Sequence, residues 1–166
     1  MAISTAPATE TPLLDSREQA AWRGLLRTHM ALTKALDLQL EAEHGLSLTS
    51  YEVLLHVEDS GEDRMRMCDL ASSVLLSRSG LTRLVDRLER DGLIVRESCA
   101  DDARGQFAVL TDAGREKLGA ARATHLAGVR DLFLSHFSAE EQEKLGAAWG
   151  RVLPGASAAA GRRCGC

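Results

Sequence analysis

Aromatic residues are scarce in this chain of 166 residues, where they make up only 4% of the sequence. A core with so few aromatic rings must be built mainly from leucine, valine and alanine. Apolar residues nevertheless account for 45% and charged residues for 27%, a balance that is typical of a soluble globular protein. The length fits one domain of ordinary size, or a small domain with helical extensions.

Signals for secretion and for membrane insertion are missing. A signal peptide begins with basic residues followed by an apolar run, whereas the first basic residue here is Arg17 and residues 1–14 are rich in alanine, threonine and proline. No stretch approaches the roughly 18 apolar residues that span a bilayer. We therefore expect a cytoplasmic protein.

The usual marks of catalysis and metal binding are also missing. The sequence contains no glycine-rich phosphate loop, no metal triad and no nucleophile motif, so we expect no enzyme and no cofactor. The four cysteines (Cys68, Cys99, Cys164 and Cys166) lack the spacing of a zinc site. In a reducing cytosol they are expected to be free thiols.

The charge of the whole chain does not favour nucleic acid as a partner. The net charge is -4, while nucleic-acid-binding domains are usually basic. One stretch reverses this balance: residues 64–96 hold seven arginines and four acidic residues. Any case for DNA binding therefore depends on this segment.

Hydrophobic periodicity predicts a mainly helical fold. We expect helices over residues 16–44, 50–59, 69–75, 78–90, 112–137 and 139–152. Capping-box patterns stand at Asp15 or Ser16, at Thr49 with Glu52, and at Ser138 with Glu141. Residues 64–67 resemble an edge strand, and residues 93–99 and 106–110 alternate as the two strands of a hairpin do.

Two short helices followed by a hairpin are the order of a winged helix-turn-helix. We assign residues 48–111 to this DNA-binding domain, and residues 15–47 and 112–153 to long flanking dimerisation helices. Residues 1–14 and 154–166 are expected to be a disordered arm and a flexible tail. One face of the helix over 112–137 is apolar and needs a partner, and symmetric pairing is the commonest solution. That face comprises Leu118, Ala121, His125, Val129, Leu132 and Phe133.

The helix predicted over residues 78–90 has the surface of a recognition helix. Taking about 100° per residue, its apolar arc comprises Leu81, Leu84, Val85 and Leu88. The other side holds Ser79, Arg83, Asp86 and Arg90, flanked by Thr82 and Arg87. Guanidinium groups pair with guanine edges or phosphates, and hydroxyls reach both. The alternative is an amphipathic helix with ordinary surface arginines.

The turn of the hairpin carries a second cationic group. Arg104 lies at the tip, and a thin loop of this kind can place an arginine in the narrow minor groove. Asp102 can brace it by a salt bridge. The alternative is a generic polar turn.

At this point the sequence resembles the MarR family of regulators over residues 15–153. The most specific part is LLSRSGLTRLVDRLERDGL at residues 75–93, followed by Asp102 with Arg104 and by LTDAG at residues 110–114. The resemblance implies an obligate dimer and a ligand-tunable repressor of a pseudo-palindromic site. It assigns DNA contacts to Ser77, Arg78, Ser79, Thr82, Arg83, Arg87 and Arg104, with Asp102 as the brace.

The nature of the signal is left open by the sequence. Trp22 and His29 share a face of the first helix and, with Arg66, would contact a small aromatic anion; the alternative is that Trp22 packs in a core or dimer interface and His29 is buried. A thiol sensor would use Cys68 or Cys99, although family sensors of organic peroxide carry their cysteine on the first helix, which has none here.

Two further alternatives complete the set. A zinc sensor would draw on His29, His44, His125 or His136 with Glu41 or Glu43, but these residues lack compact spacing. A winged-helix module used for protein contact is the rival from another class of function.

Overall fold

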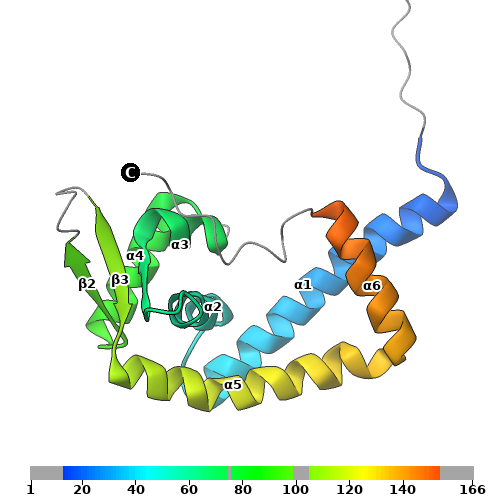
Figure 1. The fold of residues 1–166 in the computed structure, drawn as a ribbon. Coiled ribbons are helices and arrows are strands. Elements are labelled where there is room, and N and C mark those ends of the chain that lie inside the picture. The colour runs from blue at the N-terminus through cyan, green and yellow to red at the C-terminus, as the bar shows by residue number, and fades with distance from the viewer. Residues whose placement is uncertain (1–12, 75, 99–104, 154–166) are drawn as a thin grey trace, which may run out of the picture.

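The computed structural model describes residues 13–74, 76–98 and 105–153 (Figure 1). Its elements are, in chain order, α1 (Ser16–His44), α2 (Leu48–Glu58), β1 (Arg64–Arg66), α3 (Met67–Ser73), α4 (Arg78–Arg90), β2 (Ile94–Ser98), β3 (Gln106–Leu110), α5 (Asp112–Leu132), the 3-10 turn η1 (Leu134–His136) and α6 (Ala139–Val152). The predicted fold class, mainly helical with a small hairpin between long helices, is confirmed.

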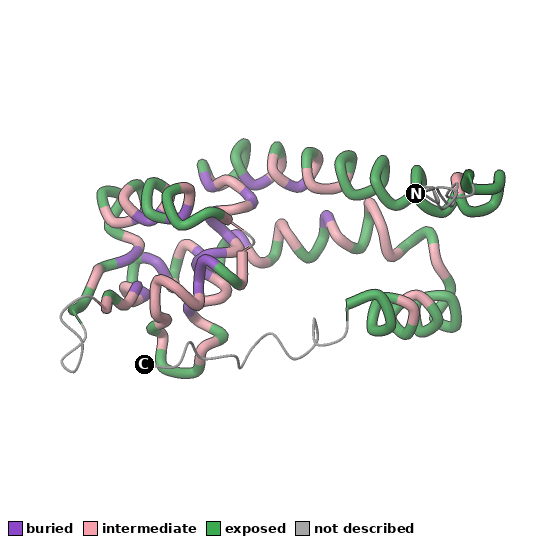
Figure 2. The backbone as a smooth tube through the Cα atoms, turned by 90° about the horizontal axis from the view of Figure 1, so that it is seen from above, coloured by how far each residue is buried: buried purple, intermediate pink, exposed green. Residues whose placement is uncertain are grey.

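The long helix α1 has the boundaries that the sequence predicts. At its start, the Asp15 carboxylate accepts the Glu18 backbone N–H at 2.8 Å, and Glu18 accepts the Asp15 N–H in return. At its end, Gly45 has a φ of +58°, a left-handed conformation that suits glycine. Helix α1 lies alongside α5 over its second half (Figure 2).

Helix α2 begins earlier than predicted. The pattern of Thr49 and Glu52 suggested a start at residue 50, but Ser47 is the N-cap and its hydroxyl accepts the Ser50 N–H at 3.2 Å. The Asp37 carboxylate of α1 also accepts the Leu48 N–H at 2.8 Å. Because a neighbouring helix satisfies this end donor, the first turn forms where local sequence alone did not indicate it.

Two other predicted boundaries are wrong. Helix α3 covers Met67–Ser73 rather than residues 69–75, and α5 ends at Leu132 rather than near residue 137. The chain leaves helical geometry at Phe133, whose ring packs against Phe137 with centroids 5.1 Å apart. The Gln142 side chain of α6 then donates to the backbone carbonyls of Leu134 and Phe137. These tertiary bonds stabilise a break that periodicity does not reveal.

The three strands form one antiparallel sheet in the order β1-β3-β2. The hairpin pairs Arg96 with Ala108, and β1 pairs Arg64 with Val109. Helix α5 starts directly against this unit. A Cβ on Gly114 would lie 2.1 Å from the Leu93 carbonyl oxygen, so only glycine permits the contact.

The hydrophobic core lies where α2, α3, α4 and the sheet meet the end of α1 and the first half of α5 (Figure 2). Leucine, valine and alanine dominate it, as the composition predicted, and the aromatic ring within it is Tyr51, which is 2% exposed. Helix α6 contributes no buried residue. Among the described residues, no helix combines the length and apolar content needed to cross a membrane.

Candidate nucleic-acid interface

Helix α4 has the apolar side and the polar side that its sequence periodicity predicted. The Ser77 hydroxyl caps it by accepting the Gly80 N–H at 3.1 Å. Leu81, Val85 and Leu88 are buried against the core, while the opposite side is exposed. The buried side fixes the orientation of α4, and therefore the direction in which its polar side chains point.

The first turns of α4 present an exposed row of hydroxyl and guanidinium groups. Its members are Ser77, Arg78, Ser79, Thr82 and Arg83. The Thr82 hydroxyl donates to the Arg78 carbonyl at 2.9 Å, and the hydroxyls of Ser77 and Ser79 lie 3.3 Å apart. The structure thus brings together on one surface five of the residues to which DNA contacts were assigned.

Arg87 has a different role within the protomer. Its Nη2 donates to the hydroxyls of Ser50 at 2.8 Å and Ser47 at 3.2 Å, both at the start of α2. The guanidinium thereby joins the last turns of α4 to the turn after α1. Both bonds use Nη2, and the contact of Arg87 with DNA stays a prediction.

Arg96 on β2 is one of the seven arginines of residues 64–96, and the sequence did not predict a role for it. Its guanidinium contacts Asp86 and Glu89 of α4, each at 2.6 Å, and its side chain is only 18% exposed. A signal was present in the sequence, because residues 94, 96 and 98 alternate on one face of the strand and Ile94 on that face is apolar. A charge on an inward face requires partners.

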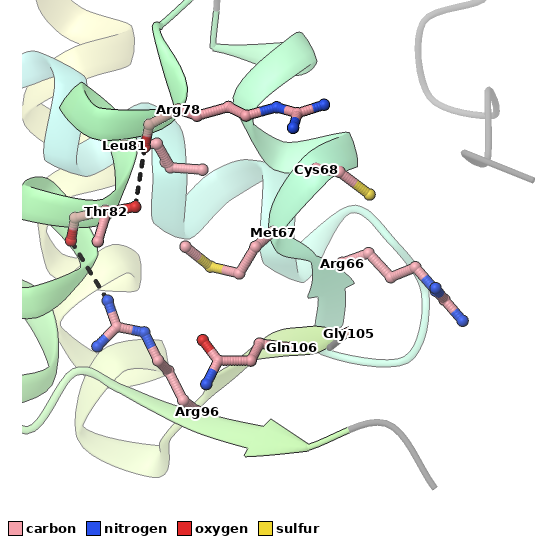
Figure 3. Close-up of a pocket in the computed structure, with 9 residues that line it drawn as sticks. All are labelled: Arg66, Met67, Cys68, Arg78, Leu81, Thr82, Arg96, Gly105 and Gln106. Carbon is pink, nitrogen blue, oxygen red and sulfur yellow. Dashed lines mark hydrogen bonds between the residues drawn. The ribbon is translucent and has the colours of Figure 1, made fainter. Parts of the chain in front are cut away.

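A cavity of about 320 Å³ lies between α4 and the sheet. Its lining comprises Arg66, Met67, Cys68, Arg78, Leu81, Thr82, Arg96, Gly105 and Gln106 (Figure 3). Figure 3 shows Arg96 and Gln106 rising from the strands below Thr82, while Arg66 and Cys68 point away from Arg96. The concave surface between α4 and the sheet is therefore lined by three arginines, Arg66, Arg78 and Arg96.

The sheet bears cationic side chains on its other face as well. The guanidinium carbons of Arg64 and Arg66 lie 4.3 and 5.3 Å from the centroid of the Phe107 ring, within the range of cation–π contact. Asp102 and Arg104, assigned to the tip of the hairpin, lie outside the described residues, as do Cys99, Cys164 and Cys166.

The residues predicted to sense a ligand do not form one site. Trp22 and His29 are exposed on α1, so neither packs in the core of the protomer; packing of Trp22 in a dimer interface stays an alternative. Arg66 lines the cavity beside α4, to which neither of them contributes. His29 instead lies within electrostatic range of Glu52 on α2; burial raises the pKa of this carboxyl, and the charges of His56 and His29 oppose the rise.

The contact between α2 and α5 contains a second polar cluster. The rings of Tyr51 and His125 stack with centroids 4.5 Å apart, and Arg122 of α5 forms an ion pair with Glu58 of α2. Burial raises the pKa of the Tyr51 hydroxyl and lowers the pKa of His125. This cluster joins the winged region to the long helix.

Thiol and metal chemistry find little support in the described segments. The Cys68 sulfur lies in the first turn of α3, 3.9 Å from a carboxylate oxygen of Asp69. Within residues 13–74, 76–98 and 105–153, no group of three or more histidine, cysteine or acidic side chains is placed to hold a metal ion.

The order of α3, α4 and the β2–β3 hairpin, with an arginine-bearing face on α4, defines a winged helix-turn-helix DNA-binding protein. Residues 44–105 match the MarR family. AbsC, a MarR-family transcriptional regulator from Streptomyces coelicolor, is 37% identical and superposes with a TM-score of 0.80 over 86% of this chain and 95% of that chain.

A related structure contains DNA. Sco3205, another MarR-family regulator from Streptomyces coelicolor, was solved in complex with DNA; it is 35% identical with a TM-score of 0.81, over 86% of this chain and 89% of that one. The regulator YkoM from Bacillus subtilis is 34% identical over 103 residues, which span 62% of this chain and 65% of YkoM. The chain belongs to the MarR family and is a DNA-binding transcriptional regulator, not an enzyme.

Proposed function

We propose that the protein is a cytoplasmic repressor that binds a pseudo-palindromic operator as a homodimer and responds to a small aromatic anion. The observation that carries the DNA-binding part is the surface of α4. Its buried leucines and valine fix the helix on the core, and the opposite side exposes hydroxyl and guanidinium groups. Side chains of these types read base edges in the major groove and bind phosphates.

In this proposal the contacts divide between two grooves. The first turns of α4 enter the major groove with Ser77, Arg78, Ser79, Thr82 and Arg83, and Arg87 contacts phosphate. Arg104 enters the minor groove, where Asp102 braces it. The division of residues follows from the sequence pattern, and the exposure of the α4 residues supports it.

Residues 15–47 and 112–153 supply the dimer interface, and residues 48–111 form the DNA-binding domain. The support is a set of exposed apolar side chains on the helices outside the winged region: Trp22, Leu25, Leu26, Met30, Leu126, Trp149 and Val152. A two-fold partner that covers this surface would place two copies of α4 about one helical turn of DNA apart, roughly 34 Å.

The effector is proposed to bind against α1, where Trp22 supplies a ring and His29 a hydrogen-bond donor. The electrostatic interaction of His29 with Glu52 of α2 supports a site between α1 and the winged region. Arg66 would meet such an anion only in the cavity beside α4.

A gel-shift titration with the DNA upstream of the protein's own gene tests the proposal. We expect binding at low salt and a steep loss of affinity as salt rises, because released counterions drive phosphate contacts. Salicylate or urate should weaken binding. A response to peroxide or zinc alone would favour the thiol or metal alternatives, and no DNA binding at any salt concentration would favour a protein-interaction module.

A further inference from the structure

Arg96 is a charged residue on the inward face of β2. Its partner across the ladder, Ala108, is fully buried, and so is Ile94 on the same face. A guanidinium group in such a place is stable only when its donors are used. The guanidinium donors of Arg96 therefore need acceptors close by.

Apart from its strand pairing with Ala108, the hydrogen bonds of Arg96 to other described residues all go to the recognition helix. The backbone N–H donates to Glu89 Oε1 at 3.2 Å and Nη1 to Glu89 Oε2 at 2.6 Å. Nη2 donates to Asp86 Oδ1 at 2.6 Å. It also donates to the Thr82 carbonyl oxygen at 3.3 Å, a bond that Figure 3 shows. Spacings of four and three place these partners on one face of α4. A single side chain of the hairpin thus spans two turns of the recognition helix.

We propose that Arg96 is a positioning residue for DNA binding, which holds the hairpin strands at a fixed distance from α4 so that both engage the duplex together. This inference rests on the proposed function, because it assumes that α4 and the hairpin contact different grooves. A planar guanidinium with several donors suits the task, since it can bond two carboxylates and a carbonyl at once.

The hydrophobic contacts explain why this role is separable from folding. Leu81, Val85 and Leu88 of α4 and Ile94 of β2 are all essentially fully buried in one core. Those contacts hold the elements together without the ion pairs. The ion pairs fix the orientation of β2 relative to α4, because charge-assisted hydrogen bonds require a narrower range of geometry than apolar packing does.

Arg96 also neutralises two carboxylates on the helix that faces DNA, and this effect must be separated from positioning. The variant Arg96→Met leaves Asp86 and Glu89 unpaired, and their charge alone would repel phosphates. The triple variant Arg96→Met/Asp86→Asn/Glu89→Gln removes the repulsion and still lacks the bridge. If its affinity returned to that of the wild type, charge neutralisation would be the whole role and the proposal would be overturned.

The experiment uses the full chain and a duplex that the wild-type protein selects from a random-sequence pool. Affinity is measured by fluorescence anisotropy, and groove contacts are mapped at saturating protein. For Arg96→Met and the triple variant we expect affinity to fall roughly tenfold or more. Protection of guanine N7 in the major groove should persist, while protection from hydroxyl radicals along the minor groove should be lost.

Arg64→Met is the matched control, because Arg64 lies in the same sheet and pairs with Glu62 and Glu97 rather than with α4. It should keep both kinds of protection. Arg96→Lys retains the positive charge but lacks the forked donors of the guanidinium group. If circular dichroism shows that Arg96→Met does not fold, Arg96→Lys is used in its place. Unchanged affinity in these variants, or parallel loss of both protections, overturns the proposal. Failure of the wild-type protein to select any duplex would instead refute the proposed function.

Discussion

The winged region and the ends of the long helices differ in how much apolar surface they cover. Most of the buried side chains belong to α2, α3, α4 and the sheet, with the parts of α1 and α5 that contact them. By contrast, Trp22 near the start of α1 is 54% exposed and Val152 at the end of α6 is 66% exposed. Figure 2 places the buried positions together near one end of the molecule.

This difference indicates which part of the protein is complete by itself. The winged region shares one core with the end of α1 and the first half of α5, so its DNA-facing surface is defined within one chain. The helical ends carry large apolar side chains that are 40–66% exposed, such as Trp149, Trp22 and Val152, and surfaces of this kind mark sites of association. The following predictions test whether the two regions depend on different partners.

Removal of α6 should have the largest effect. A chain that ends at residue 137 loses the surface proposed for pairing, and we expect monomer or aggregate in sedimentation experiments and no operator binding. The matched control ends at residue 153 and retains α6, so it should behave as the wild type. A dimer that binds DNA without α6 would contradict the assignment of residues 112–153.

Substitutions in the two regions should destabilise the protein in different ways. Leu54→Ala opens space at a fully buried position and should lower the free energy of unfolding by about 2–5 kcal/mol at every protein concentration. Trp149→Ala, at a position 40% exposed, should instead make the midpoint of unfolding more dependent on protein concentration. Denaturant titrations at two concentrations check both. The same concentration dependence in both variants would remove the distinction.

Arg83→Ala and Arg104→Ala should each weaken specific DNA binding by about 1–3 kcal/mol and leave the dimer intact. Anisotropy titrations and sedimentation measure the two properties on the same samples. Arg17→Ala is the control, since that arginine lies at the far end of α1 beside Asp15. Unchanged affinity in both test variants would rule out the proposed contacts.

The smallest effect concerns pH. Burial lowers the pKa of His125 in the folded chain, so the unfolded chain binds more protons as the pH falls below 6.5. Stability should therefore decrease as the pH is lowered from 7 towards 5, and His125→Phe, which keeps a ring against Tyr51, should reduce this decrease.

Glu52 contributes with the opposite sign. Burial raises the pKa of its carboxyl above 4.5, so its contribution is present at low pH and is lost as the pH rises through the raised value. Glu52→Gln should therefore be more stable than the wild type at pH 7. Denaturant titrations across the pH range measure both effects; equal pH dependence in wild type and His125→Phe would show that the His125 ring does not couple folding to protons.

Local sequence signals predicted most of this architecture. The capping boxes at Asp15 and Ser138 and the glycine at residue 45 mark helix ends that the structure confirms. The apolar arc of α4 was correct because amphipathic periodicity reports directly which side is buried.

The errors arose where bonds between neighbouring elements decide the outcome. Asp37 of α1 satisfies the first turn of α2, and Gln142 of α6 stabilises the break after α5. The bonds of Arg87 to α2 and of Arg96 to α4 likewise join residues that no local pattern connects. The row of polar residues on α4 was predictable, whereas its attachment to neighbouring elements was not.

Gly114 lets the long helix α5 begin in close contact with the backbone of another segment. Because its missing side chain lets α5 begin against the carbonyl of Leu93, the turn that follows α4 and the base of α5 touch through backbone atoms. Helix α5 has 21 residues and extends roughly 30 Å towards α6. Any side chain at residue 114 would therefore push the first turn of this long helix away from the turn that follows the recognition helix.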